Sequence, residues 1–211
     1  MTSPETGPTD VYFDFLCPFA WRGVELADVL RREQGLPFRL RHFSLVQGNH
    51  PENPDRKAPT WWLHEQGAGE GEPFQRGSLR AFLAAHAAAR QGEGAAWRFT
   101  LALFRARHER RAELDEETIR AAAGEAGLDL EQFTRDLADD AALRDELGAE
   151  LRDAAALGVF GTPTFALPEG HASYLRFSRL TRDPKEAQDL WGLYGEVLRS
   201  GAGIETIKRP R

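Results

Sequence analysis

The sequence predicts an α/β protein in which an N-terminal β-α-β unit and a C-terminal β-β-α unit are separated by a block of α-helices. Three observations lead to this prediction. Short apolar runs lie near both ends of the chain, residues 74–157 are rich in Ala, Leu, Arg and Glu, and Gly and Pro mark the joins. A chain of 211 residues with 41% hydrophobic residues can also bury a sizeable core.

The first unit begins with the apolar run Val11–Leu16, which suits a strand covered on both faces. Pro18 fits the first turn of a helix, and Gly35 supplies a stop, so we expect a helix over Pro18–Gln34. Residues 38–43 alternate apolar and polar side chains and predict a second strand. Strands joined by one helix are normally parallel, which places the turn after the first strand at the carboxyl edge of the sheet, where ligands usually bind.

The central part of the chain is predicted to be a polar loop followed by helices. Residues 47–59 are rich in Asn, Pro and charge and predict the loop, which leads into the segment 60–63. Asp115 and Asp129 have the character of helix N-caps. Apolar or aromatic side chains recur at helical spacing, as at Trp97, Leu101, Phe104 and His108 and at Leu143, Leu147, Leu151 and Ala155. No strand pattern interrupts this block, so we interpret it as a helical insertion that folds over the sheet.

The last part of the chain returns to strand patterns. The runs 160–167 and 173–177, separated by Pro and Gly, predict a β-hairpin. Asp183 supplies an N-cap, Pro184 a first-turn residue and Glu186 a capping acid for a final helix. The order of elements is therefore β-α-β, helical block, β-hairpin, α.

Cys17 is the only cysteine of the chain and lies where the first strand gives way to the first helix. Unpaired backbone N–H groups and the helix dipole stabilise an anion there, so we expect a lowered thiol pKa and a nucleophilic thiolate. A dithiol C-x-x-C site would need a second cysteine at position 20, which is Ala20. The alternative is an inert cysteine that packs as a small hydrophobe.

Two segments resemble a known family. The run Asp14-Phe15-Leu16-Cys17-Pro18-Phe19-Ala20-Trp21 and the later Gly161-Thr162-Pro163-Thr164-Phe165, in this order of elements, resemble the DsbA-like branch of the thioredoxin superfamily. That branch contains thiol-disulfide oxidoreductases, kappa-type glutathione transferases and 2-hydroxychromene-2-carboxylate isomerases. The resemblance implies a thioredoxin fold interrupted by an α-helical insertion domain.

The domain division implied by the resemblance has five segments. We expect a disordered tail over 1–9, a discontinuous thioredoxin-like domain over 10–59 and 158–200, a helical insertion domain over 60–157 and a C-terminal tail over 201–211.

The resemblance also implies roles for particular residues. Cys17 occupies the nucleophilic position, and Thr162-Pro163 matches the cis-proline loop, whose backbone pairs with a thiol peptide or disulfide substrate. Asp14, inside an apolar run, is a candidate acid that tunes the thiol, and a carboxylate satisfied by hydrogen bonds is the alternative. Trp21 lines a substrate groove or packs in the core. The expected substrate- or thiol-binding residues are Pro18, Phe19, Ala20, Trp21, Thr162 and Pro163.

The leading functional hypothesis is a DsbA-like oxidoreductase that acts through one cysteine. Cys17 attacks a disulfide or mixed disulfide, and a low-molecular-weight thiol resolves the adduct because Ala20 cannot. The resemblance implies no tightly bound cofactor, with glutathione or another small thiol as co-substrate. One alternative is a glutathione-dependent transferase or isomerase, although Pro168–Arg176 lacks the Gly-rich, Asp-Arg-containing pattern of those branches. A second alternative is a non-catalytic protein that binds a peptide or an apolar ligand.

Composition limits the partners. A formal net charge of -6 argues against nucleic acid and anionic membranes, and no apolar run is long enough to span a bilayer. With no recognisable export signal and one unpaired cysteine, we expect a cytoplasmic protein. The histidines show no i, i+4 pair, so no metal site is predicted. Trp61 and Trp62, taken as adjacent residues of a helix, are the first candidates for a homodimer contact.

Overall fold

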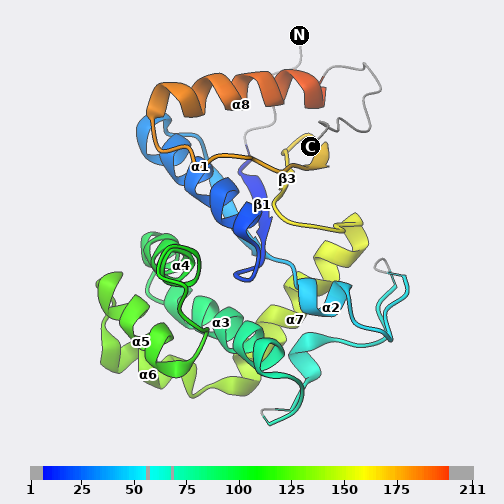
Figure 1. Ribbon diagram of the computed structural model, residues 1–211, viewed down its shortest axis with the longest axis vertical. Helices are drawn as coiled ribbons and strands as arrows, with labels where there is room; N and C mark the ends of the chain where they lie inside the picture. Colours follow the sequence, from blue (N-terminus) through cyan, green and yellow to red (C-terminus); the bar gives the residue numbers. More distant parts are fainter. Residues whose placement is uncertain (1–6, 56–57, 68, 200–211) are drawn as a thin grey trace.

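The computed structural model describes residues 7–55, 58–67 and 69–199, and a four-stranded sheet lies at its centre (Figure 1). The strand order is β2-β1-β3-β4, with β1 parallel to β2 and antiparallel to β3, and with β3 antiparallel to β4. This arrangement confirms the predicted parallel β-α-β unit and the hairpin. The strands are Thr9–Phe13 (β1), Phe38–His42 (β2), Thr164–Ala166 (β3) and Ala172–Tyr174 (β4).

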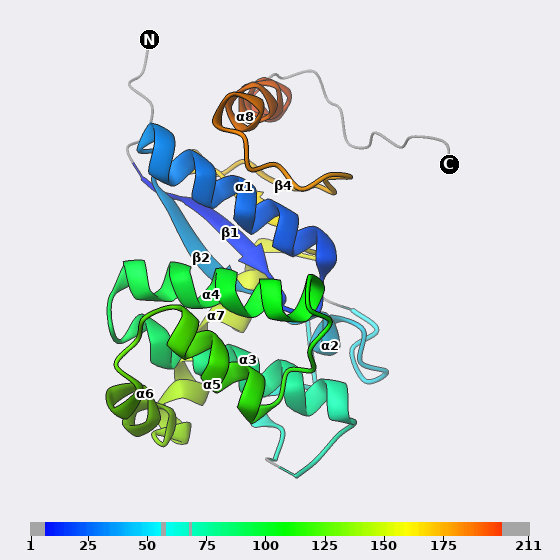
Figure 2. The same cartoon turned by 60° about the vertical axis from the view of Figure 1, so that its left-hand side comes forward.

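The helix α1, Pro18–Gln34, packs on β1 and β2, and α8, Pro184–Arg199, lies beyond it (Figure 2). Both ends of α1 agree with the prediction, because strong local signals mark them. Pro18 occupies the first turn, and Gly35 ends the helix with a φ of 66°, in the left-handed region that favours glycine. At α8 the Asp183 carboxylate accepts the N–H of Glu186 at 2.8 Å, as the predicted cap requires.

Between β2 and β3 in the sequence comes a block of helices, which forms the lower part of Figure 1. The carboxylates of Asp115 and Asp129 cap two of these helices, as predicted. No helix among the described residues is long and apolar enough to cross a membrane. The helices of this block are α3 (Pro73–Ala89), α4 (Glu93–His108), α5 (Glu116–Glu125), α6 (Leu130–Leu137) and α7 (Asp140–Leu157), and the short helices α2 (Leu45–Gly48) and η1 (Leu63–Glu65) precede them.

Aromatic side chains join the sheet to the helical block. Phe13 at the end of β1 and Phe15 in the turn after it contact Phe104 of α4, with ring centroids 5.5 and 5.0 Å apart. Phe15 also contacts Phe82 of α3. All four rings are buried and belong to one apolar cluster that includes residues of the sheet, α1 and the insertion. Burial of these rings therefore fixes the turn after β1, which carries Cys17, against the insertion.

Two sequence expectations fail in detail. The strands are shorter than predicted, and β1 ends at Phe13 because the carboxylate of Asp14 accepts backbone N–H groups of Leu16 and Leu45 and so turns the chain. Trp61 and Trp62 are not helical, because Asn53 accepts the Trp61 N–H and holds that segment in a bend. The predicted tails lie mostly outside the described residues, although Thr9 already belongs to β1.

Candidate functional site

Cys17 is the N-cap residue of α1. Its backbone is extended, with φ of -95° and ψ of 114°, and its Sγ accepts the N–H of Ala20 at 3.4 Å. The side chain therefore satisfies one of the backbone donors that a helix leaves free at its N-terminus. Only 7% of Cys17 is exposed to solvent. The sulfur lies at the N-terminal end of a 17-residue helix, the positive end of the helix dipole.

The loop of Thr162 and Pro163 contacts the same sulfur. The Thr162–Pro163 peptide bond is cis, and the Cys17 Sγ lies 3.3 Å from the carbonyl oxygen of Thr162, to which the thiol donates. The Leu175 N–H donates to the Pro163 carbonyl at 3.1 Å and so ties the loop to the segment after β4. Thr162 is buried, yet its Oγ1 finds no hydrogen-bond partner among the described residues. A donor or acceptor on a bound molecule would satisfy that hydroxyl.

Gly23 allows the proline loop to approach α1 closely. A Cβ at position 23 would lie 2.6 Å from Cγ and 2.8 Å from Cβ of Pro163. Glycine is therefore required where the second turn of α1 passes beneath the loop. The close contact between Gly23 and the Pro163 ring keeps Thr162 beside Cys17.

Asp14 lies at the start of the turn that leads to Cys17 and is fully buried. Its two carboxylate oxygens accept the N–H groups of Leu16 at 2.8 Å and Leu45 at 2.7 Å. Burial raises the pKa of Asp14 to about 6, although these hydrogen bonds and the nearby His42 oppose the rise. Because both oxygens are engaged with the backbone, the carboxylate holds the turn in place. The hydrogen bond between the two residues is a backbone one, in which the Cys17 N–H donates to the Asp14 carbonyl.

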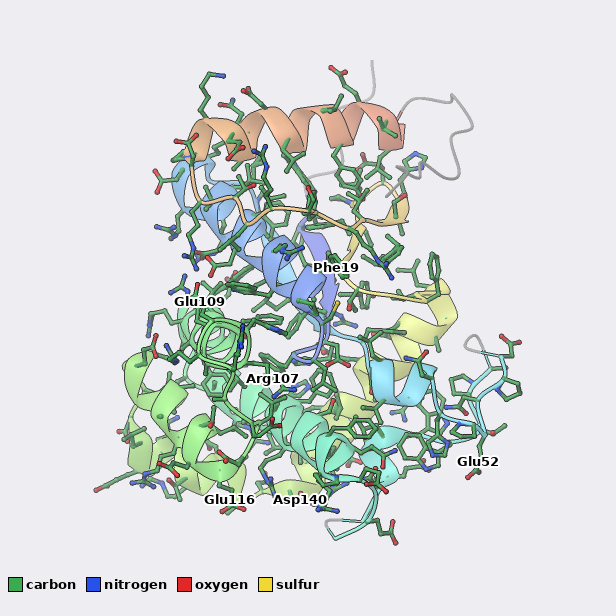
Figure 3. All side chains as sticks on the ribbon, in the orientation of Figure 1. Phe19, Glu52, Arg107, Glu109, Glu116 and Asp140 are labelled. Carbon is green, nitrogen blue, oxygen red and sulfur yellow. The ribbon has the colours of Figure 1, made fainter. Side chains whose placement is uncertain are left out.

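The remaining residues predicted around the thiol fall into two groups. Pro18 is exposed and Phe19 half-buried at the N-terminal end of α1, near the middle of the molecule, where Figure 3 labels Phe19. Ala20 is fully buried, so a ligand has access to none of its side chain. Trp21 stacks on His108 of α4, with ring centroids 5.7 Å apart, and its Nε1 donates to Glu25. Its contacts are thus those of a residue packed between α1 and the insertion.

Two arginines that the sequence did not single out flank Phe19. The guanidinium carbons of Arg22 and Arg176 lie 5.3 and 4.8 Å from the centre of the Phe19 ring. Arg22 donates to the Phe177 carbonyl and Arg176 to the Tyr174 hydroxyl, and neither forms an ion pair with a carboxylate of the described residues. Arg176 is far from Phe19 in sequence and reaches its ring only because the segment after β4 pairs with the proline loop.

Another missed feature is a buried acid in α1. Glu25 accepts hydrogen bonds from Arg105 of α4 and from Arg182, which precedes α8. Burial opposes the ionisation of Glu25, but these two arginines outweigh it and lower its pKa to about 2. Sequence patterning predicts a solvated face for Arg105, since acidic residues follow it along the chain, and gives no signal of a partner in α1.

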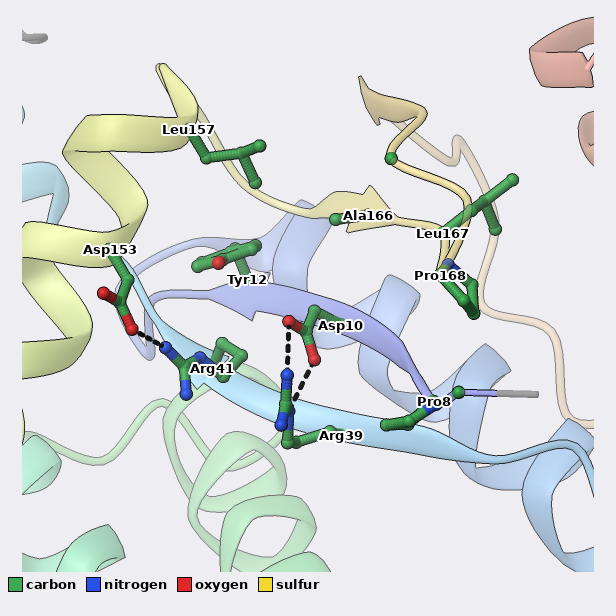
Figure 4. Close-up of a pocket in the computed structure, with 12 residues that line it drawn as sticks. Pro8, Asp10, Tyr12, Arg39, Arg41, Asp153, Leu157, Ala166, Leu167 and Pro168 are labelled. Atoms are coloured by element: carbon green, nitrogen blue, oxygen red, sulfur yellow. Dashed lines mark hydrogen bonds and ion pairs between the residues drawn. The ribbon is translucent and has the colours of Figure 1, made fainter. Parts of the chain in front are cut away.

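Two cavities lie on different sides of this region. A cavity of about 330 Å³ borders Leu16, the neighbour of Cys17, and is lined mainly by residues of α2, the following loop and the start of α3, including Leu45, Val46, His50 and Phe74. A larger one, of about 530 Å³, lies on the sheet face that bears Asp10 and Tyr12 (Figure 4). There Asp10 pairs with Arg39 and Asp153 with Arg41, so its charges are already neutralised. Cys17 lines neither of these two cavities, and the smaller one is lined by its sequence neighbour Leu16.

Comparison with known proteins agrees with this geometry. Residues 9–179 match the family described as DSBA-like thioredoxin domain. No curated protein matches the sequence. Among solved structures, a 2-hydroxychromene-2-carboxylate isomerase is similar with a TM-score of 0.61 and 20% identity, over 95% of this chain and 100% of that one.

Two other solved structures show the same fold. The cytosolic disulfide reductase DsbM from Pseudomonas aeruginosa, solved with GSH, has a TM-score of 0.58 and 19% identity over 90% of this chain and 100% of its own. A probable DsbA oxidoreductase from Streptomyces coelicolor has a TM-score of 0.55 and 21% identity over 95% of this chain and 94% of its own. With a match over most of its length, this chain belongs to the DSBA-like thioredoxin domain family.

Proposed function

We propose that this protein is a thiol-disulfide oxidoreductase that acts through Cys17 alone, with a low-molecular-weight thiol as co-substrate. One observation carries the proposal: the Cys17 sulfur lies between the Ala20 N–H at a helix N-terminus and the carbonyl of Thr162 in the cis-proline loop. When the thiol loses its proton, the Ala20 N–H and the helix dipole stabilise the anion. The same loop offers the buried Thr162 hydroxyl to a bound disulfide or thiol.

The proposed reaction is a pair of thiol-disulfide exchanges. The Cys17 thiolate attacks one sulfur of a substrate disulfide, the S–S bond breaks, and the other half leaves as a thiolate that takes up a proton. A small thiol, as its thiolate, then attacks the substrate sulfur of the mixed disulfide. The Cys17 thiolate leaves and is ready for another cycle, and the small thiol ends in a disulfide with the substrate half. The small thiol supplies the electrons, and the protein returns to its starting state.

The small thiol is needed because the chain has no second cysteine. Ala20, at the position of a resolving cysteine, has a fully buried methyl group. We place the reaction in the cytoplasm, where reduced small thiols are abundant. Supporting this choice, the similar DsbM is described as a cytosolic disulfide reductase and was solved with GSH.

Arg22 and Arg176 are the side chains that we assign to recognition of the small thiol. Both guanidinium groups flank Phe19, two residues after Cys17 in sequence, and neither is neutralised by a carboxylate of the described residues. Biological small thiols such as glutathione carry carboxylates, and a guanidinium binds a carboxylate through charge-assisted hydrogen bonds. The cavity beside Leu16 would take the less polar half of the substrate disulfide.

A second candidate is a glutathione-dependent transferase or isomerase, and the burial of Cys17 favours it. With 7% of the residue exposed and its thiol donating to Thr162, Cys17 is also suited to orienting the sulfur of a bound thiol without reacting itself. In that case the protein would bind glutathione without forming a covalent adduct. A non-catalytic protein would bind a peptide or apolar ligand and leave Cys17 unreactive.

Steady-state disulfide reduction tests the proposal. Wild-type protein and Cys17→Ser are compared with a small disulfide as substrate and glutathione as reductant. Ser at a helix N-cap accepts the same Ala20 N–H, so the variant removes the nucleophile while keeping the cap. We expect wild-type turnover and none with Cys17→Ser. Equal turnover in the two proteins would remove Cys17 from the mechanism and favour the orienting role.

A further inference from the structure

Three potential metal ligands from distant parts of the chain meet between the sheet and the insertion. His42 ends β2, His86 lies in α3 and Glu150 in α7, and one ligand atom from each lies within 4.8 Å of the others. The spacing of histidines along the sequence gives no sign of this group, because each member comes from a different element. None of the three residues is among those assigned to the Cys17 site, so this inference does not rest on the proposed oxidoreductase activity.

The spacing of the ligand atoms suits a small divalent ion. His42 Nδ1 lies 2.6 Å from Oε2 of Glu150, and His86 Nε2 lies 3.9 Å from the same oxygen. Zinc bonds to histidine nitrogen and carboxylate oxygen are roughly 2.0–2.2 Å long, so tetrahedral ligands stand roughly 3.3–3.5 Å apart. The two observed separations lie on either side of that value. If the distance from Glu150 Oε2 to His42 Nδ1 lengthens modestly and the distance to His86 Nε2 shortens modestly, the atoms reach the required geometry.

The surroundings of His86 select the free nitrogen that a metal needs. Its Nδ1 faces Oε2 of Glu146 at 3.4 Å, and Oε1 of Glu146 is held by Arg90 at 3.0 Å. A metal-binding histidine commonly donates its second ring N–H to a carboxylate in this way, which directs the lone pair of the other nitrogen to the ion. His86 is 8% exposed, and its Nε2 has no hydrogen-bond partner among the described residues. With the ring proton on Nδ1, the lone pair of Nε2 would face the Glu150 oxygen 3.9 Å away, an arrangement that a cation between them would stabilise.

The two oxygens of Glu150 face different partners. Arg41 lies 3.6 Å from Oε1, whereas Oε2 accepts the backbone N–H of His42 at 2.9 Å and faces the imidazoles of His42 and His86.

We propose that His42, His86 and Glu150 bind one divalent transition-metal ion of the zinc class. Two imidazoles and one carboxylate are a common ligand set of Zn²⁺ and of neighbouring first-row ions, whereas Ca²⁺ and Mg²⁺ prefer oxygen ligands alone. The ion would join β2 to α3 and α7 and so fix the insertion against the sheet. The partly exposed side chain of Glu146, at 43%, marks the side from which an ion would reach the group.

Metal titration of the full chain tests this site, with Zn²⁺ followed by equilibrium dialysis and Co²⁺ by visible absorption. Both are run on wild-type protein and on Cys17→Ser, which removes the thiol as a competing ligand. We expect one ion per chain in both proteins, and a Co²⁺ spectrum typical of four ligands without sulfur. The variants His86→Gln and Glu150→Gln should weaken binding by about tenfold or more. The control His171→Gln, which changes an exposed histidine next to β4, should bind as the wild type does.

Two results would overturn the assignment. One is binding of less than one ion per chain at metal concentrations in excess of protein, which would leave the group as a histidine–carboxylate contact only. The other is unchanged affinity in His86→Gln. If the buried variants fail to fold, Glu146→Gln decides, because its partly exposed carboxylate orients His86 without touching the ion. The affinity of the Glu146→Gln protein for Zn²⁺ should fall by about tenfold, and an affinity equal to that of His171→Gln would contradict the proposal.

Discussion

Asp14 shows how one residue links the turn before Cys17 to the stability of the fold. Its carboxylate is fully buried and accepts two backbone N–H groups, one of which belongs to Leu45 at the start of α2. The residue thus joins the turn after β1 to the turn after β2, and it ends β1 early. The sequence marks Asp14 as a residue of interest but leaves open whether it acts on the thiol, and its hydrogen bonds indicate a positioning role.

The raised pKa of Asp14 predicts a specific pH dependence of stability. The folded pKa is about 6 and the ordinary value 3.8, so between these values the unfolded chain has released a proton that the folded protein keeps. The contribution of Asp14 is therefore fully present below pH 3.8 and is lost as the pH rises through 6. Relative to Asp14→Asn, the wild-type free energy of unfolding should fall by about 3 kcal/mol across this range. Urea unfolding of both proteins from pH 3.5 to pH 7 measures it, and a constant difference would contradict the raised pKa.

Arg176 provides a test of how the small thiol is recognised. If its guanidinium binds a carboxylate of that thiol, Arg176→Met should raise KM for glutathione about fivefold, the effect of losing roughly 1 kcal/mol from an exposed charge pair, and leave kcat near the wild-type value. Arg179→Met is the matched control, because Arg179 is exposed in the same segment and already pairs with Glu186. An equal change of KM in both variants would show that the effect comes from the overall charge and not from a contact made by Arg176.

Residues close in sequence to Cys17 were predictable, and those brought to it by folding were not. The helix N-terminus and the neighbouring Phe19 follow from local patterns. Arg176 reaches Phe19 only through the pairing of Leu175 with Pro163, which no local pattern contains. The three ligands of the proposed metal site are separated in the same way.

Among the elements, α1 carries most of the site, and Gly23 sets how closely it meets the proline loop. Gly23→Ala would place a methyl group 2.6 Å from Pro163 Cγ, so α1 or the loop must move. We expect a loss of about 1–3 kcal/mol in the free energy of unfolding from overpacking, with a fall in disulfide reductase activity. Gly124→Ala in α5 is the control, because nothing lies within 4 Å of its added Cβ, and it should gain about 0.5–1 kcal/mol. Unchanged stability and activity in Gly23→Ala would show that the loop adjusts freely.

Helices were predicted better than strands because their ends depend on local chemistry. Pro18 and Gly35 determine both ends of α1, and the caps at Asp115 and Asp129 start α5 and α6. The ends of strands depend on partners far away in the chain. Although the apolar run continues to Leu16, β1 ends at Phe13 because Asp14 turns the backbone, and β3 and β4 pair over only three residues each. The bend at Trp61 likewise depends on its hydrogen bonds with Asn53, which accepts the Trp61 N–H and donates to the Trp61 carbonyl.

At the scale of the whole molecule, Glu25 ties three regions together. From α1 it binds Arg105 in the insertion and Arg182 ahead of α8, while the apolar cluster continues from the sheet into the insertion. Replacing Glu25 with Gln leaves Arg105 without its paired carboxylate and Arg182 with Glu109 alone, and at neutral pH we expect a loss of about 3 kcal/mol in the free energy of unfolding.

The lowered pKa of Glu25 gives this prediction a second readout. The folded pKa is about 2 and the ordinary value 4.5, so the stabilisation is present above pH 4.5 and is lost as the pH falls toward 2. Wild-type protein should therefore lose more stability than Glu25→Gln between pH 5 and pH 2, as followed by thermal unfolding. Parallel pH profiles would show that the pair contributes no net charge stabilisation.

The most direct test of the proposed function is intact-mass analysis of the full chain after incubation with glutathione disulfide. The Cys17 thiolate should attack one sulfur of that disulfide, form a mixed disulfide with one glutathionyl group and release one glutathione. We predict one such adduct per chain, absent from Cys17→Ser and removed by added glutathione. A folded wild-type protein that forms no adduct would contradict a nucleophilic Cys17 and favour non-covalent binding of the thiol.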